Sequence, residues 1–399
     1  MKRRIVFVDD EPFVLEAHKR MLRPMRHEWE MEFVTSGTEA LARLEHTGVD
    51  VVVSDVRMPG MDGVELLNAI KDRHPHTVRF LLSGQADRET LMKAIGPSHQ
   101  YLAKPCDTEV LKASIDRACA LGDLLQDDSI KRLVSQIDSM PSLPSLYLEL
   151  EEELGAPESS IERAAAIVAK DIGMTAKILK IVNSAFLGIP RTVSDPAQAV
   201  MFLGFQTLKT LVLTFAVFQQ LSQKTLPGFD VERFWQHSLA TGEQARKIAI
   251  AEQAAPSVVE ASLAGGLLHD VGMLLLVNSF PDRYQEALTI FSTRQCSLPE
   301  AETHIFKATH AEIGAYLLGL WGIPTSVIEA VAFHHRPSAS LAQVLTPLIS
   351  VHAANGLLAE QDPRNLEREP PPFFDLNYLA ELNFTNRIPV WRELSLVSN

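Results

Sequence analysis

The sequence predicts an α/β domain with a doubly wound, five-stranded parallel sheet, followed by an all-α domain. Up to about residue 120, five short apolar runs alternate with helical stretches, as in a parallel sheet covered by helices on both faces. Beyond about residue 140, nearly every segment has helical periodicity and strand patterns are nearly absent. A chain of 399 residues is also too long for one ordinary core, so we expect two or three domains.

Each predicted element follows from its local pattern. The strands are apolar runs at 4–8, 32–34, 49–53, 78–82 and 101–102, with helices between them, for example at 64–71 and 108–119. The helical pattern continues through 125 and 137, which predicts one long helix or two helices with a break near Gly122. The later helices are predicted at 160–170, 175–183, 196–218, 231–251, 258–277, 311–320 and 325–334.

Domain boundaries follow from changes in these patterns. Pro141 and Pro144 end the connecting segment, and three successive prolines at 370–372 mark a stiff linker. We therefore divide the chain into an α/β domain, a helical connector, an all-α domain, and a Pro-rich linker with a helical tail, at residues 1–120, 121–139, 140–360 and 361–399. The tail is expected to pack against the all-α core or to reach the α/β domain.

Composition restricts the classes of partner. The net charge of −13 argues against broad affinity for nucleic acid or for anionic membrane, and no recognition-helix motif is visible, so DNA binding is not expected. A helix that spans a membrane needs roughly 20 consecutive apolar residues, and we expect no such helix in this sequence. Three widely spaced cysteines suit a reducing compartment. We expect a cytoplasmic protein.

Polar residues follow four of the predicted strands at the edge where functional groups of parallel sheets gather. Asp9 and Asp10 follow the first strand, Asp55 the third, Ser83 the fourth and Lys104 the fifth. Clustered carboxylates favour a hard cation such as Mg²⁺, and with the ion bound Asp55 can attack phosphorus while Lys104 neutralises charge on the phosphoryl oxygens. The alternative is that the two N-terminal aspartates cap a helix and that the lysine lies at the surface.

The motifs that carry these residues resemble those of two-component receiver domains. They are VDDE at 8–11, SDVRMPGMDG at 54–63, LLSG at 81–84 and YLAKP at 101–105. The resemblance implies a flavodoxin-like fold with Asp55 as the phosphoacceptor. It implies that Asp9, Asp10, Asp55 and the Arg57 carbonyl bind Mg²⁺ or support its ligands. It implies that Lys104 contacts the phosphoryl group and that the Lys104–Pro105 peptide is cis. Ser83 and Tyr101 would form the switch pair.

A second set of chemical residues lies in the helical region. Histidines and one aspartate recur on several predicted helices: His237, His269, Asp270, His310, His334 and His335, with Asn355 further on. Imidazoles and a carboxylate from several helices can hold one or two transition-metal ions such as Fe, Mn or Zn, which can activate water for phosphoester hydrolysis. The alternative is that each histidine is a hydrogen-bonded core residue.

The helical region resembles the HDOD domain, a relative of HD-type metal-dependent phosphohydrolases, over residues 133–345. The matching segments are PSLP, AKDIGMTAKILKIVNSAFLG, AVMFLG, FWQHS, GLLHDVG and HAEIGAYLLGLWGIP followed by HH. The resemblance implies a signalling output module that is not generally catalytic. Related cyclic dinucleotide phosphodiesterases have a lysine where Met273 stands, a metal-binding aspartate where Asn355 stands, and a GYP loop that is missing after His335.

These observations favour a response regulator without a DNA-binding module. A sensor histidine kinase would phosphorylate Asp55, and the HDOD domain would relay the signal by binding a downstream signalling protein. A homodimer is also expected. The competing predictions are a receiver-gated metal-dependent phosphohydrolase acting on a cyclic dinucleotide or nucleotide, and a module that senses a nucleotide without hydrolysing it.

Overall fold

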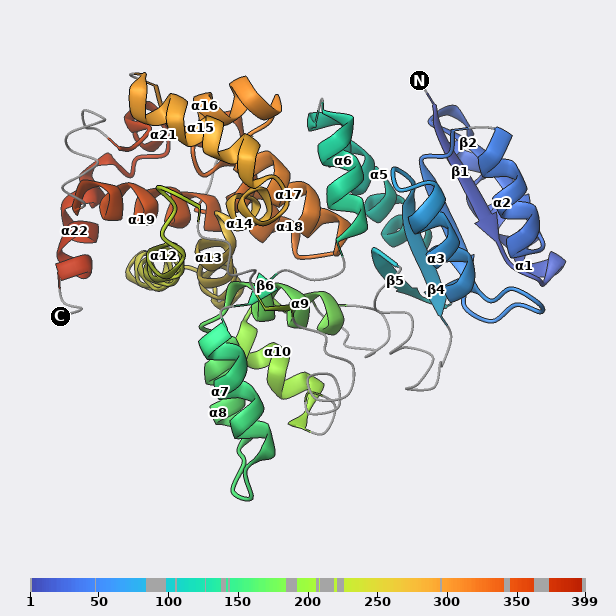
Figure 1. Cartoon of the computed structure of the whole chain (residues 1–399), viewed down its shortest axis with the longest axis horizontal. Helices are drawn as coiled ribbons and strands as arrows, with labels where there is room; N and C mark the ends of the chain where they lie inside the picture. Colours follow the sequence, from blue (N-terminus) through green and yellow to red (C-terminus); the bar gives the residue numbers. More distant parts are fainter. Residues whose placement is uncertain are drawn as a thin grey trace.

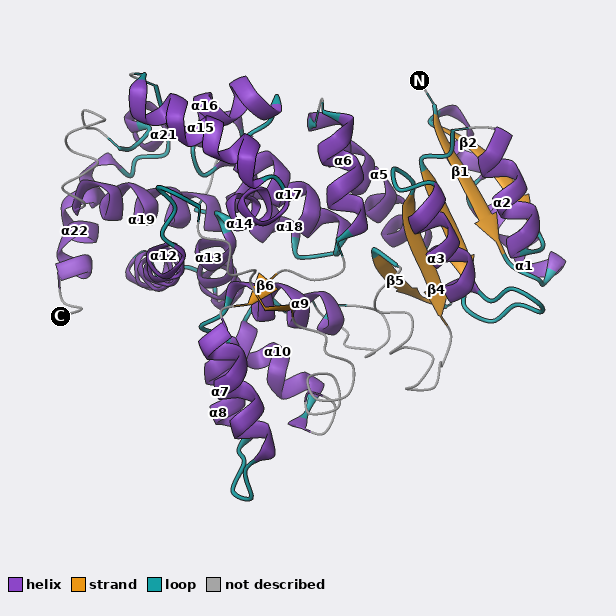
Figure 2. Ribbon diagram, viewed as in Figure 1, coloured by secondary structure: helices purple, strands orange, loops and turns teal. Residues whose placement is uncertain are grey.

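The computed structural model has a sheet with its covering helices at one end, and the rest is helical apart from one short strand pair (Figure 2). It describes residues 2–46, 48–83, 98–104, 106–125, 127–137, 141–142, 144–183, 192–205, 208, 219–220, 226–294, 296–340, 345–361 and 373–396.

A parallel sheet of five strands forms the N-terminal part, in the order β2-β1-β3-β4-β5. The strands are β1 Arg3–Val8, β2 Trp29–Val34, β3 Val51–Asp55, β4 Val78–Ser83 and β5 Gln100–Ala103. The order reverses direction beside β1, as in a doubly wound sheet. The predicted fold class is confirmed; β2 begins three residues earlier than its apolar pattern suggested.

Helices cover both faces of this sheet because alternate strand residues are apolar on both sides. Val6 and Val52 pack in one buried cluster with side chains of α2 (Gly37–His46) and α3 (Gly63–Arg73). The opposite face, with Phe7 and Val53, packs with α1 and α5, at Pro12–Met21 and Thr108–Leu124. A short 3-10 helix at Arg23–His27 leads into β2.

The connector is two helices rather than one. After α5, Leu125 is buried in extended backbone, and α6 covers Asp128–Gln136. The Asp127 carboxylate accepts a hydrogen bond from the Ser129 backbone N–H at 2.8 Å, which caps the new helix. Of the two predicted forms, the broken one is correct, with its break three residues beyond Gly122.

The C-terminal two thirds are helical, as predicted. The first helices are α7 Pro144–Gly155, α8 Ile161–Val168, α9 Ile172–Val182 and α10 Pro196–Leu203. The central set is α12 Val231–Ala251, α13 Pro256–Leu268, α14 Val271–Ser279, α15 Pro281–Thr293, α16 Leu298–Phe306, α17 His310–Leu320, α18 Thr325–Phe333 and α19 Pro347–Gln361. Pro141–Ser142 (β6) and Gln219–Gln220 (β7) add a short parallel pair that no sequence pattern indicated.

Two predicted helices need correction. The segment predicted as one helix at 258–277 is broken at His269–Asp270 into α13 and α14. The segment predicted at 196–218 ends at Leu203, because Gly204 has a φ of 80°, outside the helical region. Most of the remainder of that segment lies outside the described residues.

The apolar run that contains α13 and α14 is longer than the sequence analysis recognised. Pro256–Ser279 has 24 residues and is apolar enough to span a membrane by length and composition. However, 72% of its most apolar window is buried inside the molecule, as expected of a core helix in a large helical domain. Cytoplasmic localisation remains a prediction.

The C-terminal tail packs against α12 and α19 at the edge of the helical part (Figure 1). Its helices are α21 Leu376–Glu381, a 3-10 turn at Thr385–Arg387, and α22 Ile388–Leu396. The Trp391 indole N–H donates to Glu252 at 2.7 Å, and Gln244 donates to the Trp391 carbonyl at 3.1 Å. The tail therefore packs against the helical core, the first of the two positions that we considered.

The sheet and the helical part meet across α17, with α5 and α6 between them (Figure 1). Gly122 of α5 faces the ring of Tyr316, and Gly319 of α17 faces Leu121, so that the two helices approach closely. Gln100 in β5 donates a side-chain hydrogen bond to the Gly319 carbonyl at 2.9 Å and is itself buried. These contacts join the sheet edge to the C-terminal end of α17.

A buried charged residue adds a second link. Arg79 of β4 is 1% exposed, and its guanidinium donates to the Ser135 carbonyl in α6. On the other side of α6, at its N-terminal cap, Asp127 pairs with Arg283 of α15 at 3.0 Å. Moving α6 away from the sheet would leave the buried Arg79 guanidinium without its hydrogen bond to Ser135. Because a buried charge without partners is unfavourable, Arg79 helps to hold α6 against the sheet.

Packing of α14 on α17 predicts that Gly272→Ala destabilises the helical part. A Cβ at position 272 would lie 2.0 Å from the His310 backbone oxygen, which cannot move without shifting α17. We expect the free energy of unfolding to fall by about 1–3 kcal/mol, measured by urea denaturation followed by circular dichroism. Gly155→Ala is the matched control, since a Cβ there meets nothing within 4 Å. Equal stability of the two variants would show that the close approach is not as tight as described.

Candidate functional site

The first candidate site is the acidic crevice at the C-terminal edge of the sheet. Asp9 follows β1, Asp55 ends β3 and Lys104 follows β5, and the lysine Nζ lies 2.6 Å from Asp9 Oδ2 and 2.5 Å from Asp55 Oδ1. Burial alone would lower the pKa of Lys104, but the carboxylates of Asp55 and Asp9 outweigh that effect and raise it. The lysine therefore stays charged between two carboxylates.

Local sequence holds Asp55 in this position. Its Oδ2 accepts a hydrogen bond from the Arg57 backbone N–H at 3.1 Å, and the Ser54 hydroxyl donates to its carbonyl at 2.8 Å. The next helix begins directly beside it: a Cβ at Gly63 would lie 2.0 Å from the Asp55 carbonyl oxygen. The Asp62 carboxylate accepts the Glu65 backbone N–H at 2.8 Å and caps that helix, so the start of α3 and the end of β3 are fixed together.

The donors in the crevice suit a magnesium ion. Asp9 is 2% exposed, Asp10 next to it is half-buried, and Asp55 lies opposite, which gives three carboxylates and one ammonium. Hard divalent cations prefer oxygen ligands, and three carboxylates with one lysine carry an excess of negative charge. Asp10, Asp55 and the Arg57 carbonyl are the groups that would hold Mg²⁺, whose charge would assist phosphoryl transfer.

The proposed switch pair is only partly described. Ser83 is paired with Ala103 across β4 and β5, which places it one residue from Lys104 at the sheet edge. Tyr101 lies two residues before Ala103 on β5. The side chains of both residues, Pro105 with its predicted cis peptide, and the segment 84–97 lie outside what the structure describes. The switch roles of Ser83 and Tyr101 remain predictions.

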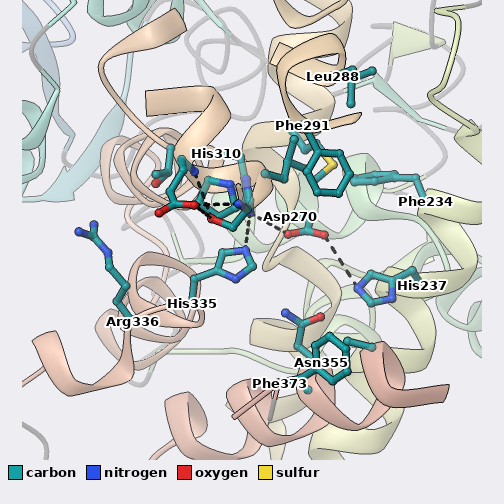
Figure 3. A pocket seen from close by; sticks show the side chains of 18 of the residues that line it. Phe234, His237, Asp270, Leu288, Phe291, His310, His335, Arg336, Asn355 and Phe373 are labelled. Carbon is teal, nitrogen blue, oxygen red and sulfur yellow. Dashed lines mark hydrogen bonds and ion pairs between the residues drawn. The ribbon is translucent and has the colours of Figure 1, made fainter. Parts of the chain in front are cut away.

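The second candidate site is a cluster of imidazoles around Asp270 (Figure 3). Asp270 lies at the junction of α13 and α14, where the break in the apolar run turns its carboxylate into the cluster. The surrounding histidines come from four helical segments: His237 from α12, His269 from the end of α13, His310 from the start of α17, and His334 and His335 from the end of α18. All the histidines predicted for this site lie together.

Asp270 divides the cluster into two groups of possible ligands. Its Oδ1 lies 3.1 Å from His310 Nε2 and 3.5 Å from His334 Nε2. Its Oδ2 lies 3.2 Å from His269 Nε2 and 4.0 Å from His237 Nε2. Each oxygen thus faces a pair of imidazole nitrogens, and one group also includes His335. A carboxylate that serves both groups can bridge two metal ions.

Hydrogen bonds at the opposite ring nitrogens fix the orientation of these imidazoles. His269 Nδ1 lies 2.7 Å from the Gly266 carbonyl, and His334 Nδ1 lies 2.8 Å from the Val331 carbonyl. A carbonyl only accepts, so each Nδ1 carries a proton. Each Nε2 can then either donate to Asp270, when the ring is protonated, or present a lone pair toward it, when the ring is neutral. A neutral ring facing a carboxylate is stabilised by a cation between them, which is the donor arrangement of a metal site.

Charge in the cluster is strongly perturbed. Burial would raise the pKa of Asp270, but the imidazoles of His269, His310 and His334 hold it well below its usual range. Burial lowers the pKa of His334 to about 4 and that of His237 to about 4, which leaves both neutral. Burial also disfavours a charged His310, but Glu302 and Asp270 raise its pKa to about 10. A positive charge is thus favoured here, from a proton or from a metal.

Sequence reasoning missed Glu302, which is fully buried in α16. Its Oε2 lies 2.7 Å from His310 Nδ1 and accepts the His310 backbone N–H at 2.8 Å. It therefore orients His310 in the way that carboxylates orient metal-bound histidines. Nothing in the sequence distinguished this glutamate from Glu300, two residues before it.

The two departures from the hydrolase pattern also lie at the site. Met273 and Asn355 both line a cavity of about 1070 Å³ that opens beside Asp270. Asn355 lies next to His237 (Figure 3), and a hydrogen bond joins them. An amide oxygen is a weaker ligand than a carboxylate, and a thioether cannot neutralise a phosphate. The cavity is large enough for a nucleotide, but its catalytic groups are incomplete by the hydrolase pattern.

Two family models match the chain. A response regulator receiver domain matches residues 5–116, and an HDOD domain matches residues 140–337. The chain belongs to the receiver–HDOD response regulators. The acidic crevice of this response regulator lies in the first match, and the histidine cluster lies in the second.

The chain is similar over part of its length to several known proteins. An uncharacterized protein of Treponema pallidum is 28% identical over 242 residues, 60% of this chain and 45% of that protein. The receiver domain of an HD domain-containing protein from Pseudomonas fluorescens is 32% identical and covers 30% of this chain and 96% of its own, with a TM-score of 0.29. The MmoQ response regulator of Methylococcus capsulatus is 23% identical and covers 61% of this chain and 98% of its own, with a TM-score of 0.45.

The response regulator spans 45% of the Treponema protein and 31% of the hydrogenase transcriptional regulatory protein HoxA of Cupriavidus necator. These partial matches describe domains that are shared, so the activity and partners of the whole protein do not follow from them.

The cluster predicts that purified protein binds up to two divalent transition-metal ions, one for each group of ligands. Asp270→Ala removes the carboxylate that both groups share and should release the metal, as measured by inductively coupled plasma mass spectrometry after dialysis. His304→Ala is the matched control, because His304 is exposed on α16 and outside the cluster. Equal metal content in wild type and Asp270→Ala would refute a metal site here.

Proposed function

We propose that a sensor histidine kinase phosphorylates this response regulator on Asp55 with the help of Mg²⁺. The observation that supports this most directly is the ammonium of Lys104 between Asp9 and Asp55. A phosphoryl group on Asp55 would bring oxygens that compete with Asp9 for the lysine, and the lysine and the metal ion together would neutralise them. Asp55 is partly exposed, which suits attack on a phosphohistidine of a partner protein.

Phosphorylation would act on the helical part through β5. Lys104 directly follows this strand, and Gln100 at the other end of the strand donates to Gly319 of α17. A shift of the lysine toward a phosphoryl group would therefore pull on a strand whose far end contacts the output domain. Because packed interfaces have discrete arrangements, such a pull shifts the population between docked and rearranged forms.

Helix α17 connects this contact to the histidine cluster. His310 is its first residue and Gly319 lies in its last turn, so one rigid helix of about 16 Å joins the two sites. Its side chains from Ile313 to Leu320 are almost wholly buried, which leaves the helix little freedom to bend. Movement at the receiver end would be transmitted to His310 as a translation or rotation of the whole helix.

The output would be the binding of a downstream signalling protein by the HDOD part. Support comes from the catalytic groups that are replaced: Met273 stands where a substrate phosphate would need a cation, and Asn355 stands where an anionic ligand would be needed. A cluster that retains its histidines but lacks these groups can still stabilise the fold of the domain and the surface that binds a partner, without hydrolysing a substrate.

Metal-dependent phosphohydrolysis is the second candidate. The shared carboxylate of Asp270, the histidines around it and the cavity of about 1070 Å³ favour it. A turnover assay with cyclic dinucleotides on metal-loaded protein separates the two functions. Two bound ions with turnover that disappears in His269→Ala would establish the enzyme and overturn the binding function.

Phosphorylation on Asp55 predicts that Asp55→Asn reduces labelling by acetyl phosphate to background, because an amide cannot act as the nucleophile. Labelling is followed on phosphate-affinity gels, with Asp50→Asn as the control, since Asp50 precedes β3 and its carboxylate accepts the Arg4 backbone N–H outside the crevice. Affinity capture with wild-type and Asp55→Asn protein should retain different amounts of a downstream partner. Undiminished labelling of Asp55→Asn would refute the assignment.

A further inference from the structure

His352 of α19 joins the histidine cluster to the C-terminal tail. Its Nδ1 lies 2.7 Å from the His334 backbone carbonyl oxygen, and its Nε2 lies 2.9 Å from the Asp375 backbone nitrogen. The carbonyl only accepts and the amide only donates, so Nδ1 carries the proton and Nε2 carries the lone pair. One ring nitrogen is therefore used by a residue of the cluster, and the other by the N-cap residue of α21.

The ring of His352 is held in this position from several sides. The residue is 5% exposed, and burial lowers its pKa, which agrees with the neutral form that the two hydrogen bonds require. Phe374 packs edge-on against it, with the ring centroids 6.5 Å apart. Rotation of the ring would break both hydrogen bonds in the interior of the protein, so the position of the His334 carbonyl and the position of the tail depend on each other.

The same part of the tail forms a wall of the cavity of about 1070 Å³ beside the cluster. Phe373, Phe374 and Asp375 line this cavity. Phe373 lies there beside Asn355 of α19 (Figure 3). A Cβ at Gly356 would lie 2.7 Å from the Phe374 ring and 2.8 Å from the Phe373 carbonyl oxygen, so the glycine allows the tail to approach α19 closely.

Further contacts hold the tail in place beyond this wall. Trp391 is fully buried, and Arg387 donates to the same Glu252 carboxylate as the indole does, at 2.8 Å. The tail is thus a fixed part of the domain that contains the cluster. Both His352 and the tail lie beyond residue 337, where the match to the HDOD family model ends.

We propose that His352 is a positioning residue of the metal site, through which metal binding at the cluster and docking of the C-terminal tail stabilise each other. The inference rests on the metal site predicted above and adds a regulated surface to it. When His334 holds a metal ion, its backbone carbonyl is fixed as well, and this carbonyl orients His352 toward the Asp375 N–H. Because linkage is reciprocal, a docked tail would raise the affinity for the metal by the same factor.

Hydrogen–deuterium exchange of the full chain, metal-free and saturated with Zn²⁺, tests this coupling, with bound metal measured on the same samples. In wild type we expect the backbone amides of α21 to exchange more slowly by about fivefold or more when Zn²⁺ is bound.

Two substitutions of His352 each keep one of its hydrogen bonds. His352→Asn retains a donor for the His334 carbonyl but is too short to reach Asp375, and His352→Gln retains an acceptor for Asp375 but cannot also donate to His334. Both variants should bind Zn²⁺ at saturation and lose the Zn²⁺-dependent difference in α21, because the coupling needs both hydrogen bonds.

Trp391→Phe is the matched control for a merely structural effect, because it removes a hydrogen bond of the tail to Glu252 and leaves His352 intact. Its tail should exchange faster than that of wild type with and without Zn²⁺, and the difference between the two states should remain.

Three results would overturn the proposal. Equal exchange of α21 with and without bound Zn²⁺ in wild type would exclude the coupling and leave the metal site in place. A difference that persists in both His352 variants would exclude His352 as the connection. Wild type that binds no Zn²⁺ would refute the metal site itself, and this inference with it.

Discussion

The close packing of α17 against α5 is the contact on which the rest of this structure depends. Glycines at positions 122 and 319 remove the side chains that would separate the two helices. The receiver is therefore not joined to the output domain by a flexible linker alone. The two share one buried apolar cluster, which includes Phe80 of the sheet and Leu317 of α17. Any change in the receiver that alters this face must alter the environment of α17, because closely packed interiors transmit displacement.

The opposite end of α17 is constrained by charge as well as by packing. His310 lies between Glu302 and Asp270, and its position is set by hydrogen bonds to both. Two carboxylates on one imidazole make the site sensitive to whether a proton or a metal supplies the positive charge. A helix with an apolar contact at one end and an ionic contact at the other can couple events at the two ends, provided that it moves as a rigid body.

Much of the receiver could be predicted from the sequence because its determinants are local. The ends of strands can be predicted from short apolar runs. Asp9, Asp55 and Lys104 each lie within two residues of the end of one, so their convergence needs only a parallel sheet. The cluster of histidines was also recognisable, because the residues belong to segments that resemble a known domain. In both cases the sequence pattern identified chemistry-bearing residues before their contacts were known.

Features that depend on distant contacts were not predictable. The break at His269–Asp270 lies within an apolar run whose periodicity is continuous, so only packing against α17 reveals it. Glu302 is one of two glutamates in α16, and its burial follows from the placement of His310. The contact of Gln100 with Gly319 joins residues that are 219 positions apart, and no local pattern encodes it.

Hydrogen–deuterium exchange of α17 tests the central claim most directly, with the full chain compared before and after addition of beryllofluoride and Mg²⁺. If a phosphoryl-like charge at Asp55 is transmitted through β5, backbone amides of α5 and of the last turns of α17 should exchange faster in the activated form, and Asp55→Asn should show no change. Identical exchange across α5 and α17 in both forms, with beryllofluoride bound, would contradict the account.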